Sequence, residues 1–230
     1  MIKIEHTEVV GWEHAIRGMR NPMNSWDKSD SRRSKDGYRI GESDKILMRQ
    51  LCNAGTDHRK FMRMIVVYCD ITAPLYWWKE FDTYKVGTVA NSCSTMHKLT
   101  AKKFSLDDFS HEYLNAVGDT TLRSIVQELN LLRETYLDEH TTKSIVRELN
   151  ALRETYSDEH TTPEFKRFLW HAMIQLLPSS YNQKRTVMLN YEVLRNMYHA
   201  RREHKLDEWR ELCRWIEELP HSELIIGGNR

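Results

Sequence analysis

The sequence predicts an α+β fold in which a small antiparallel sheet is wrapped by helices. Residues Phe61 to Thr72 are rich in β-branched side chains, which is typical of a strand. Most other segments, and almost everything after Ser105, carry apolar residues at helical spacing. The chain has 230 residues, 40% of them hydrophobic, which is enough to bury a sizeable core. We therefore expect one α+β domain over residues 1–230.

The charge balance argues against several classes of partner. Lys and Arg number 34 and Asp and Glu number 33, so the formal net charge is +1. Such a chain has no overall field that would attract nucleic acid or an anionic membrane. The mean hydropathy is −0.66, no run approaches the roughly 18 apolar residues of a membrane span, and no signal-peptide pattern opens the chain. We expect a cytoplasmic protein without nucleic-acid or membrane partners.

Cysteine and histidine spacing gives no sign of a metal or redox centre. The four cysteines are too far apart for a C-x-x-C motif, and a chain of this length needs no disulfide to fold. The eleven histidines are scattered. We expect four reduced thiols and no metal site. The cysteines are Cys52, Cys69, Cys93 and Cys213.

The first hundred residues predict strands, helices and one long loop. A short strand and a helix fill residues 3–19, and turn-forming residues make 20–44 a long polar loop. A helix follows and ends at Gly55. Pro74 begins another helix, at the position that proline tolerates best. Residues 86–98 (VGTVANSCSTMHK) then form a run of small hydroxyl, amide and thiol side chains between two ordered elements.

A tandem repeat occupies residues 124–162. The segment SIVQELNLLRETYLDEHTT, residues 124–142, returns as SIVRELNALRETYSDEHTT, residues 144–162. This period fits neither heptads nor the usual helical solenoids. We interpret the repeat as one amphipathic helix that has been duplicated, and we expect the second copy to pack mainly on the first or on another chain. The pairs that differ are Gln127 and Arg147, Leu131 and Ala151, and Leu137 and Ser157.

Three more helices are expected after the repeat. Pro163 can start a helix, which should run to Leu176. A second helix is expected over residues 183–203, and a third from about Leu206 to just before Pro220.

Common catalytic motifs do not occur in the sequence. It contains no Gly-rich phosphate loop, no zinc-protease motif and no nucleophile elbow. A basic run from His199 to Lys205 could contact a phosphate. Cations near a helix C-terminus are favoured in any case, so a solvated helix end remains the alternative interpretation.

Two segments carry a specific pattern of residues. In the first, Pro74-Leu75-Tyr76 opens a helix, and residues 83–96 align with the motif R-H-R-x-x-S-x-N-E-x-S-x-R-Y. A shift by one residue places Asn91 on the Asn of this motif and Ser94 on its second Ser. Without the shift, the R-H-R triplet, the Glu, the second Ser and the last Arg fall on Thr83, Tyr84, Lys85, Asn91, Cys93 and Thr95.

The second segment begins at Leu177-Pro178 and continues into a helix that carries two asparagines six residues apart. These are Asn190 and Asn196, and Arg201 follows near the end of the helix. Lys184 lies between Pro178 and these asparagines. Together the two segments resemble the flavin-dependent thymidylate synthase (ThyX) family, and the chain looks like a diverged member of it.

The resemblance implies a thymidylate synthase-complementing-like fold that binds FAD and a uridine nucleotide, dUMP, and methylates that nucleotide. Enzymes of this family are homotetramers with sites between subunits, so a homo-oligomer is expected. The implied cofactor-binding residues are Thr83, Tyr84, Lys85, Asn190 and Asn196. The implied nucleotide-binding residues are Asn91, Cys93, Ser94, Thr95, Lys184 and Arg201.

Departures from the family motif keep two other functions open. The chain lacks the arginines of the R-H-R triplet and has Thr95 in place of another. Lys85 can hold a phosphate as a point charge, but it cannot reproduce the planar fork of an arginine. The alternative is a non-catalytic homo-oligomer of the same fold that binds or sequesters a nucleotide. A structural homo-oligomer is the third hypothesis, and no catalytic residue is assigned.

Overall fold

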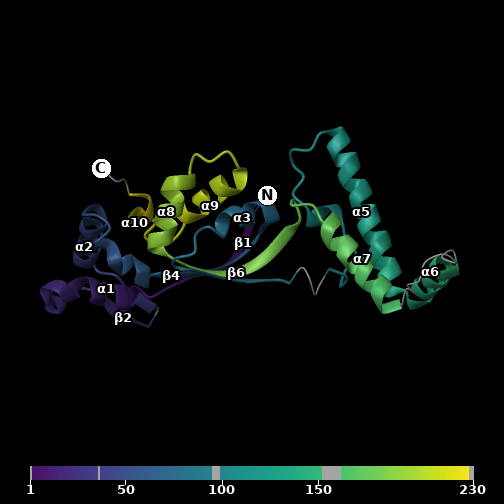
Figure 1. Cartoon of the computed structure of the whole chain (residues 1–230). Coiled ribbons are helices and arrows are strands. Elements are labelled where there is room, and N and C mark those ends of the chain that lie inside the picture. Colours follow the sequence, from purple (N-terminus) through teal and green to yellow (C-terminus); the bar gives the residue numbers. More distant parts are fainter. Residues whose placement is uncertain (1, 36, 95–98, 152–161, 228–230) are drawn as a thin grey trace. The chain divides into compact units, whose positions relative to one another are not determined.

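A computed structural model of the chain describes residues 2–35, 37–94, 99–151 and 162–227. Their contacts divide the chain into two units (Figure 1). The expectation of a single domain stays a prediction. Unit 1 comprises Met1–Ala73, Trp77–Ser92 and Lys184–Arg230, and unit 2 comprises Pro74–Tyr76 and Cys93–Gln183.

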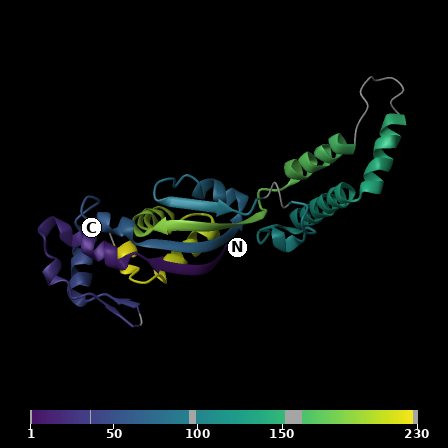
Figure 2. The same ribbon diagram turned by 90° about the horizontal axis from the view of Figure 1, so that it is seen from below.

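A four-stranded antiparallel sheet lies at the centre of unit 1 (Figures 1 and 2). The strand order is β1-β4-β6-β5, and both β1–β4 and β5–β6 are antiparallel pairs. The Tyr191 N–H at the end of β6 donates to the Ile65 carbonyl before β4 (3.0 Å), so these strands are also antiparallel. The expected small antiparallel sheet is confirmed. Its strands are β1 Lys3–Val10, β4 Val66–Pro74, β5 Thr88–Ser92 and β6 Asn182–Asn190.

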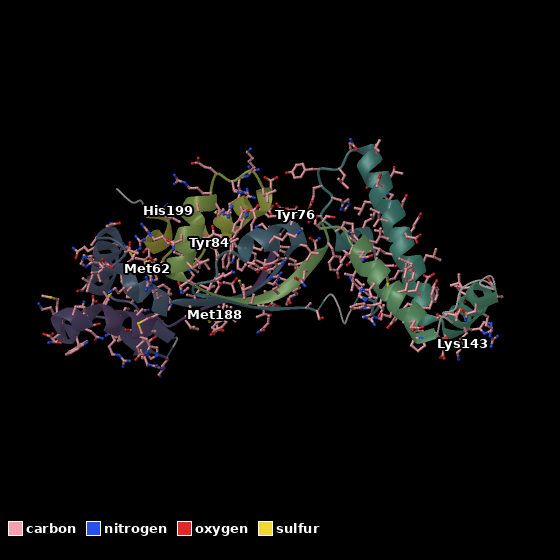
Figure 3. The ribbon with its side chains drawn as sticks, viewed as in Figure 1. Met62, Tyr76, Tyr84, Lys143, Met188 and His199 are labelled. Carbon is pink, nitrogen blue, oxygen red and sulfur yellow. The ribbon has the colours of Figure 1, made fainter. Side chains whose placement is uncertain are left out.

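Helices cover one face of this sheet. Successive side chains of a strand point to opposite faces, and Ile71 and Leu189 are fully buried whereas Tyr68 is 42% exposed. Met188 lies on the less covered face (Figure 3). Figure 1 shows α3, α8 and α9 together on the other side of the sheet. The helices of unit 1 are α1 Trp12–Arg20, α2 Glu42–Asn53, α3 Leu75–Phe81, α8 Tyr191–Arg201, α9 Asp207–Glu217 and α10 Glu223–Ile226, with a 3-10 turn at Arg59–Met64.

The structure corrects the prediction of one helix over residues 183–203. The first part of this range is strand β6, and α8 begins only at Tyr191. Buried and less buried residues alternate along the end of β6, which is the period of a strand. The Asn190 side chain then caps α8 by accepting a hydrogen bond from the Val193 N–H (2.9 Å). Residues 88–92, expected in an irregular run, form the edge strand β5.

Residues 20–44, expected as a long polar loop, contain two 3-10 turns and a β-hairpin that are held by one buried carboxylate. Asp44 is fully buried near the start of α2. It accepts hydrogen bonds from Arg20 Nε (2.6 Å), Ser29 Oγ (2.6 Å) and both the hydroxyl and the N–H of Ser31 (2.6 and 3.2 Å). Serines of this turn-rich segment therefore donate hydrogen bonds to the buried carboxylate of Asp44. The hairpin strands are β2 Arg32–Ser34 and β3 Gly37–Arg39.

Unit 2 is helical, and its helices α5 and α7 lie side by side (Figures 1 and 2). The helix expected from Pro163 to Leu176 is confirmed as α7. None of the described helices is long and apolar enough to cross a lipid bilayer. The helices are α5 Ala116–Leu137, α6 Glu139–Ala151 and α7 Thr162–Leu176. Their core consists of Leu99, Phe104, Phe109, Leu122, Val126, Leu129 and Met173.

The repeat extends over α5 and α6, and the last residues of the first copy begin α6. The first copy fills the second half of α5, which ends at Leu137, and Asp138 then accepts a hydrogen bond from the His140 N–H (2.9 Å) at the start of α6. Residues 144–151 of the second copy are helical within α6 (Figure 3 labels Lys143), and the rest of that copy lies outside the described residues. Helix α6 contacts α7 as well as α5, and packing of the second copy mainly on the first copy or on another chain stays a prediction.

Candidate functional site

Arg201 lies at the end of α8 and is held by residues from α3 and the turn that follows it. Its Nε donates to the Tyr84 hydroxyl (3.0 Å), and its Nη1 donates to a carboxylate oxygen of Glu80 (2.8 Å). The guanidinium carbon lies 4.7 Å from the centre of the Trp209 ring, within the range of a cation–π contact. The structure therefore brings two predicted site residues, Tyr84 and Arg201, into one cluster (Figure 3 labels Tyr84).

Glu80 is the centre of this cluster. Besides Arg201, it accepts a hydrogen bond from the indole N–H of Trp209 (2.9 Å), and Nε2 of His204 lies 3.6 Å away. The Leu206 N–H donates to Nδ1 of His204 (3.2 Å), which leaves the proton of the neutral ring on Nε2, facing the carboxylate. Glu80 thus neutralises the charge of the arginine that the family resemblance assigns to the nucleotide.

The side chain of Asn190 lies against Gly87, which belongs to the turn between α3 and β5. Gly87 has φ +78°, and a Cβ there would lie 2.4 Å from Nδ2 of Asn190. Only glycine allows this close approach. Because Asn190 Oδ1 caps α8, its Nδ2 is the group that remains to bind a ligand. Asn196, the second predicted asparagine, is exposed on α8.

The triplet Thr83-Tyr84-Lys85 offers one positive charge. The Thr83 hydroxyl donates to the backbone carbonyl of Glu80 (2.7 Å), and Lys85 is exposed. The triplet therefore has little capacity to neutralise a diphosphate.

Lys184 lies on the opposite face of the sheet from the Arg201 cluster. Its Nζ lies 3.1 Å from a carboxylate oxygen of Asp70 and 3.6 Å from one of Glu5. The hydrogen bond that Lys184 donates to Asp70 raises the pKa of Lys184. Within one chain, Lys184 and Arg201 do not converge on one cleft, and Lys184 is already paired with carboxylates.

The remaining predicted residues lie near the end of β5. Asn91 is exposed and pairs with Thr186 across the sheet. Cys93 is exposed, and its backbone carbonyl accepts a hydrogen bond from Gln183 Nε2 (3.0 Å). Ser94 is half-buried, and Thr95 lies outside the described residues. These residues stay predictions as nucleotide ligands.

All four cysteines are free thiols in the structure. Burial raises the pKa of both Cys52 and Cys69 to about 12 and that of Cys213 to about 11. These three thiols are inert at neutral pH, and Cys93 is the accessible one. In the described ranges, no group of His, Cys, Asp or Glu is arranged to hold a metal ion.

The basic run at the end of α8 lines a cavity of about 400 Å³. His204 borders both this cavity and Glu80. The run therefore forms a concave surface whose charged residues are Arg202, Lys205 and the acidic Glu203, and Glu203 lies 3.6 Å from Arg202. The basic residues that line it are His199, Arg202, His204 and Lys205.

Sequence reasoning missed Glu80 and Arg185. Glu80 and Tyr84 are four residues apart, the spacing that places two side chains on one side of a helical turn. That spacing was the available signal. The guanidinium of Arg185 lies 4.2 Å from the Trp78 ring centre, and its Nη1 donates to Asp82 (2.7 Å). No sequence pattern connects Arg185 with partners so far away along the chain.

Comparisons with known proteins give a consistent fold. No family model and no curated protein matches the sequence. The structure of Helicobacter pylori flavin-dependent thymidylate synthase ThyX complexed with FAD and dUMP is similar, with TM-score 0.63, 17% identity and coverage of 97% of this chain and 98% of that one. A second H. pylori ThyX structure with FAD and dUMP gives TM-score 0.63, 16% identity and 98% coverage of both chains.

A third similar structure is a UMP/dUMP methylase, PolB from Streptomyces cacaoi, bound with 5-Br dUMP. Its TM-score is 0.53 at 13% identity, and the match covers 95% of this chain and 89% of that one. At such low identity the similarity establishes the fold and no activity. The chain has the fold of the flavin-dependent thymidylate synthases.

Proposed function

We propose that this chain is a flavin-dependent thymidylate synthase-like protein that binds FAD and a uridine nucleotide such as dUMP. The observation that carries the proposal is the fold, which is shared over nearly the whole chain with structures that contain FAD and dUMP. The clustering of Tyr84 and Arg201, two residues that the family resemblance selects, adds to it.

In this proposal Arg201 contacts the nucleotide. Among the described residues its Nη2 has no hydrogen-bond partner, while Tyr84 and Trp209 flank the guanidinium. An arginine packed beside two aromatic rings is well suited to a phosphate or a pyrimidine edge. The other proposed nucleotide ligands are Asn91, Cys93, Ser94, Thr95 and Lys184.

The flavin would be held by Lys85, Asn190 and Asn196. Lys85 and Asn196 are exposed, and the amide of Asn190 lies where Gly87 lets the backbone approach closely. These donors fit a cofactor that needs hydrogen bonds and at least one cation. Bound FAD would supply hydride transfer to the pyrimidine, which no side chain can provide.

A second candidate is a non-catalytic protein that binds a nucleotide without transferring a methyl group. It is favoured by the pairing of both cations predicted to bind the nucleotide with carboxylates, Arg201 with Glu80 and Lys184 with Asp70. A carboxylate at a cation competes with a phosphate for the same charge.

The absorbance spectrum of the purified protein separates the candidates. Flavin absorbance, together with methyl transfer to dUMP, supports the synthase-like enzyme. A colourless protein whose melting temperature rises with dUMP supports the non-catalytic binder, because a ligand that binds only the native state stabilises it. If neither effect is observed, the structural homo-oligomer is the remaining candidate. Light scattering would measure its assembly.

A pair of variants tests the assigned residue. Arg201→Gln should abolish the rise in melting temperature with dUMP, whereas Arg214→Gln, an exposed arginine on α9, should keep it. Equal responses of the two variants would contradict the assignment of Arg201.

A further inference from the structure

The first copy of the repeat is recognised by a defined surface of unit 2. The side-chain amide of Asn130 pairs in both directions with the backbone of Phe104, accepting from its N–H (2.8 Å) and donating to its carbonyl (3.0 Å). Leu129 is fully buried in the same cluster. We call residues 99–109 together with Met173 of α7 the docking surface.

The second copy carries the same contact residues. Val126, Leu129 and Asn130, all buried in the first copy, return as Val146, Leu149 and Asn150. Leu149 and Asn150 are only half-buried on α6. The second copy therefore presents a face that matches the docking surface but is less completely covered.

The differences between the copies lie away from the docking surface. In the first copy the three positions that differ are all exposed: Gln127, Leu131 (58% exposed) and Leu137 (51% exposed). Exposed positions contribute little to packing. As judged by its contact residues, the docking surface does not distinguish one copy from the other.

We propose that the second copy can replace the first on the docking surface, so that the chain exchanges between two registers one repeat apart. The chain connection allows this. The pentapeptide DEHTT ends both copies, and in the second copy it leads into α7. Because α7 begins at Thr162, four residues of this pentapeptide precede it, within the roughly two to eight that commonly join neighbouring antiparallel helices. Such a connection would form a simple helical hairpin.

The present register is the more populated of the two. Leu122, which is 4% exposed in the core, would be replaced by Thr142, whose hydroxyl is costly to bury in an apolar site. The segment between Phe109 and the docked copy would also lengthen by one repeat, which costs loop entropy. Because both copies belong to one chain, their high effective concentration favours exchange within the chain over exchange between chains.

Disabling the first copy tests the proposal. Leu129→Asp places a charge in the core and removes that copy from the docking surface. In the full chain the second copy should take over, so cooperative unfolding should persist with a modestly lower melting temperature. In a chain without residues 143–162, the same substitution should abolish cooperative unfolding. Asn130→Ala should show the same contrast with a smaller shift.

Leu131→Asp is the matched control, because it introduces the same charge two residues away on the exposed side. It should be tolerated with or without residues 143–162. Leu129→Asp combined with Leu149→Asp should unfold unit 2 even in the full chain. Hydrogen exchange of the full-length Leu129→Asp chain should show protection lost from residues 124–137 and gained by 144–151, with the Phe104 amide still protected.

Three results would overturn the proposal. The first is equal destabilisation by Leu129→Asp with and without residues 143–162. The second is failure of the deletion chain itself to fold, since one copy would then not suffice to fill the docking surface. The third is a rescue that depends on protein concentration and produces dimers in light scattering, because the exchange would then occur between chains.

Discussion

Unit 1 buries charged side chains, whereas unit 2 buries neutral ones. Among the described residues, the buried charged side chains belong to unit 1, and two pairs of them form ion pairs, Arg20–Asp44 (2.6 Å) and Arg59–Glu192 (3.0 Å). The buried polar residues of unit 2 are all uncharged. They are Ser110, Asn130 and Thr142.

The difference indicates how each unit tolerates change. A buried charge needs its own partner, so each ion pair of unit 1 fixes one arrangement of two distant segments. An apolar stripe with a single amide makes no such demand, and any segment with the same stripe fits equally well. A tandem duplication is therefore accommodated more easily in unit 2 than in the charged interior of unit 1.

The largest expected effect is in unit 1. Asp44→Asn should lower the free energy of unfolding by about 3–5 kcal/mol, because it leaves Arg20 buried without a counter-ion and weakens the bonds to the serines of the 20–44 segment. Urea unfolding would measure this loss. Asp27→Asn, an exposed carboxylate in the same segment, should change the free energy by less than about 0.5 kcal/mol. A loss at Asp44 below about 1 kcal/mol would contradict the role of the buried pair.

The next effect is in the apolar core of unit 2, outside the repeat. Met173→Ala should cost about 2–5 kcal/mol, since Met173 is fully buried and its truncation leaves a cavity. Phe168→Ala on the same helix removes a larger side chain that is 63% exposed, and should cost much less. Equal losses of stability in the two variants would contradict the assignment of Met173 to the core of unit 2 and of Phe168 to its surface.

The apolar architecture was largely predictable from the sequence. The helices at 12–20 and 162–176 follow from their apolar stripes, the second also from Pro163 at its start, and the antiparallel sheet from its β-branched strand. Strand β6 was not predictable in this way, because QKRTVMLN is short and leads directly into α8. An apolar pattern that covers only one or two helical turns is compatible with both a helix and a strand.

The polar contacts were hardly predictable. Arg20 and Asp44 are 24 residues apart, and Glu80 and Arg201 are 121 apart. No local pattern links residues at such separations, and only the folded chain brings them together. Family resemblance selected Tyr84 and Arg201, but it did not indicate that Glu80 would hold the arginine.

A smaller effect is expected at this site of unit 1, and it depends on the proposed nucleotide binding. Glu80→Gln should raise the affinity for dUMP about tenfold, about 1.4 kcal/mol, because it removes the carboxylate that neutralises Arg201. Isothermal titration would measure it, with Glu218→Gln, an exposed carboxylate at the end of α9, as the matched charge control. Weaker binding by Glu80→Gln would mean that Glu80 positions Arg201 for the ligand instead of competing with it.

The smallest expected effect is a pH dependence located in unit 1. Burial lowers the pKa of His199, and the nearby Arg195 and Arg202 lower it further; its Nε2 is buried without a hydrogen-bond partner in the described part of the chain.

In the unfolded chain this histidine titrates near its ordinary pKa of about 6.5. As the pH falls below that value, the unfolded chain binds a proton that the folded chain resists, so stability decreases. Urea unfolding at pH 8 and pH 5.5 should therefore show a loss at low pH that His199→Gln reduces. His171→Gln, an exposed histidine of unit 2, should leave the loss unchanged. If His171→Gln reduced the loss of stability at low pH and His199→Gln did not, the pH dependence would arise in unit 2 and not in unit 1.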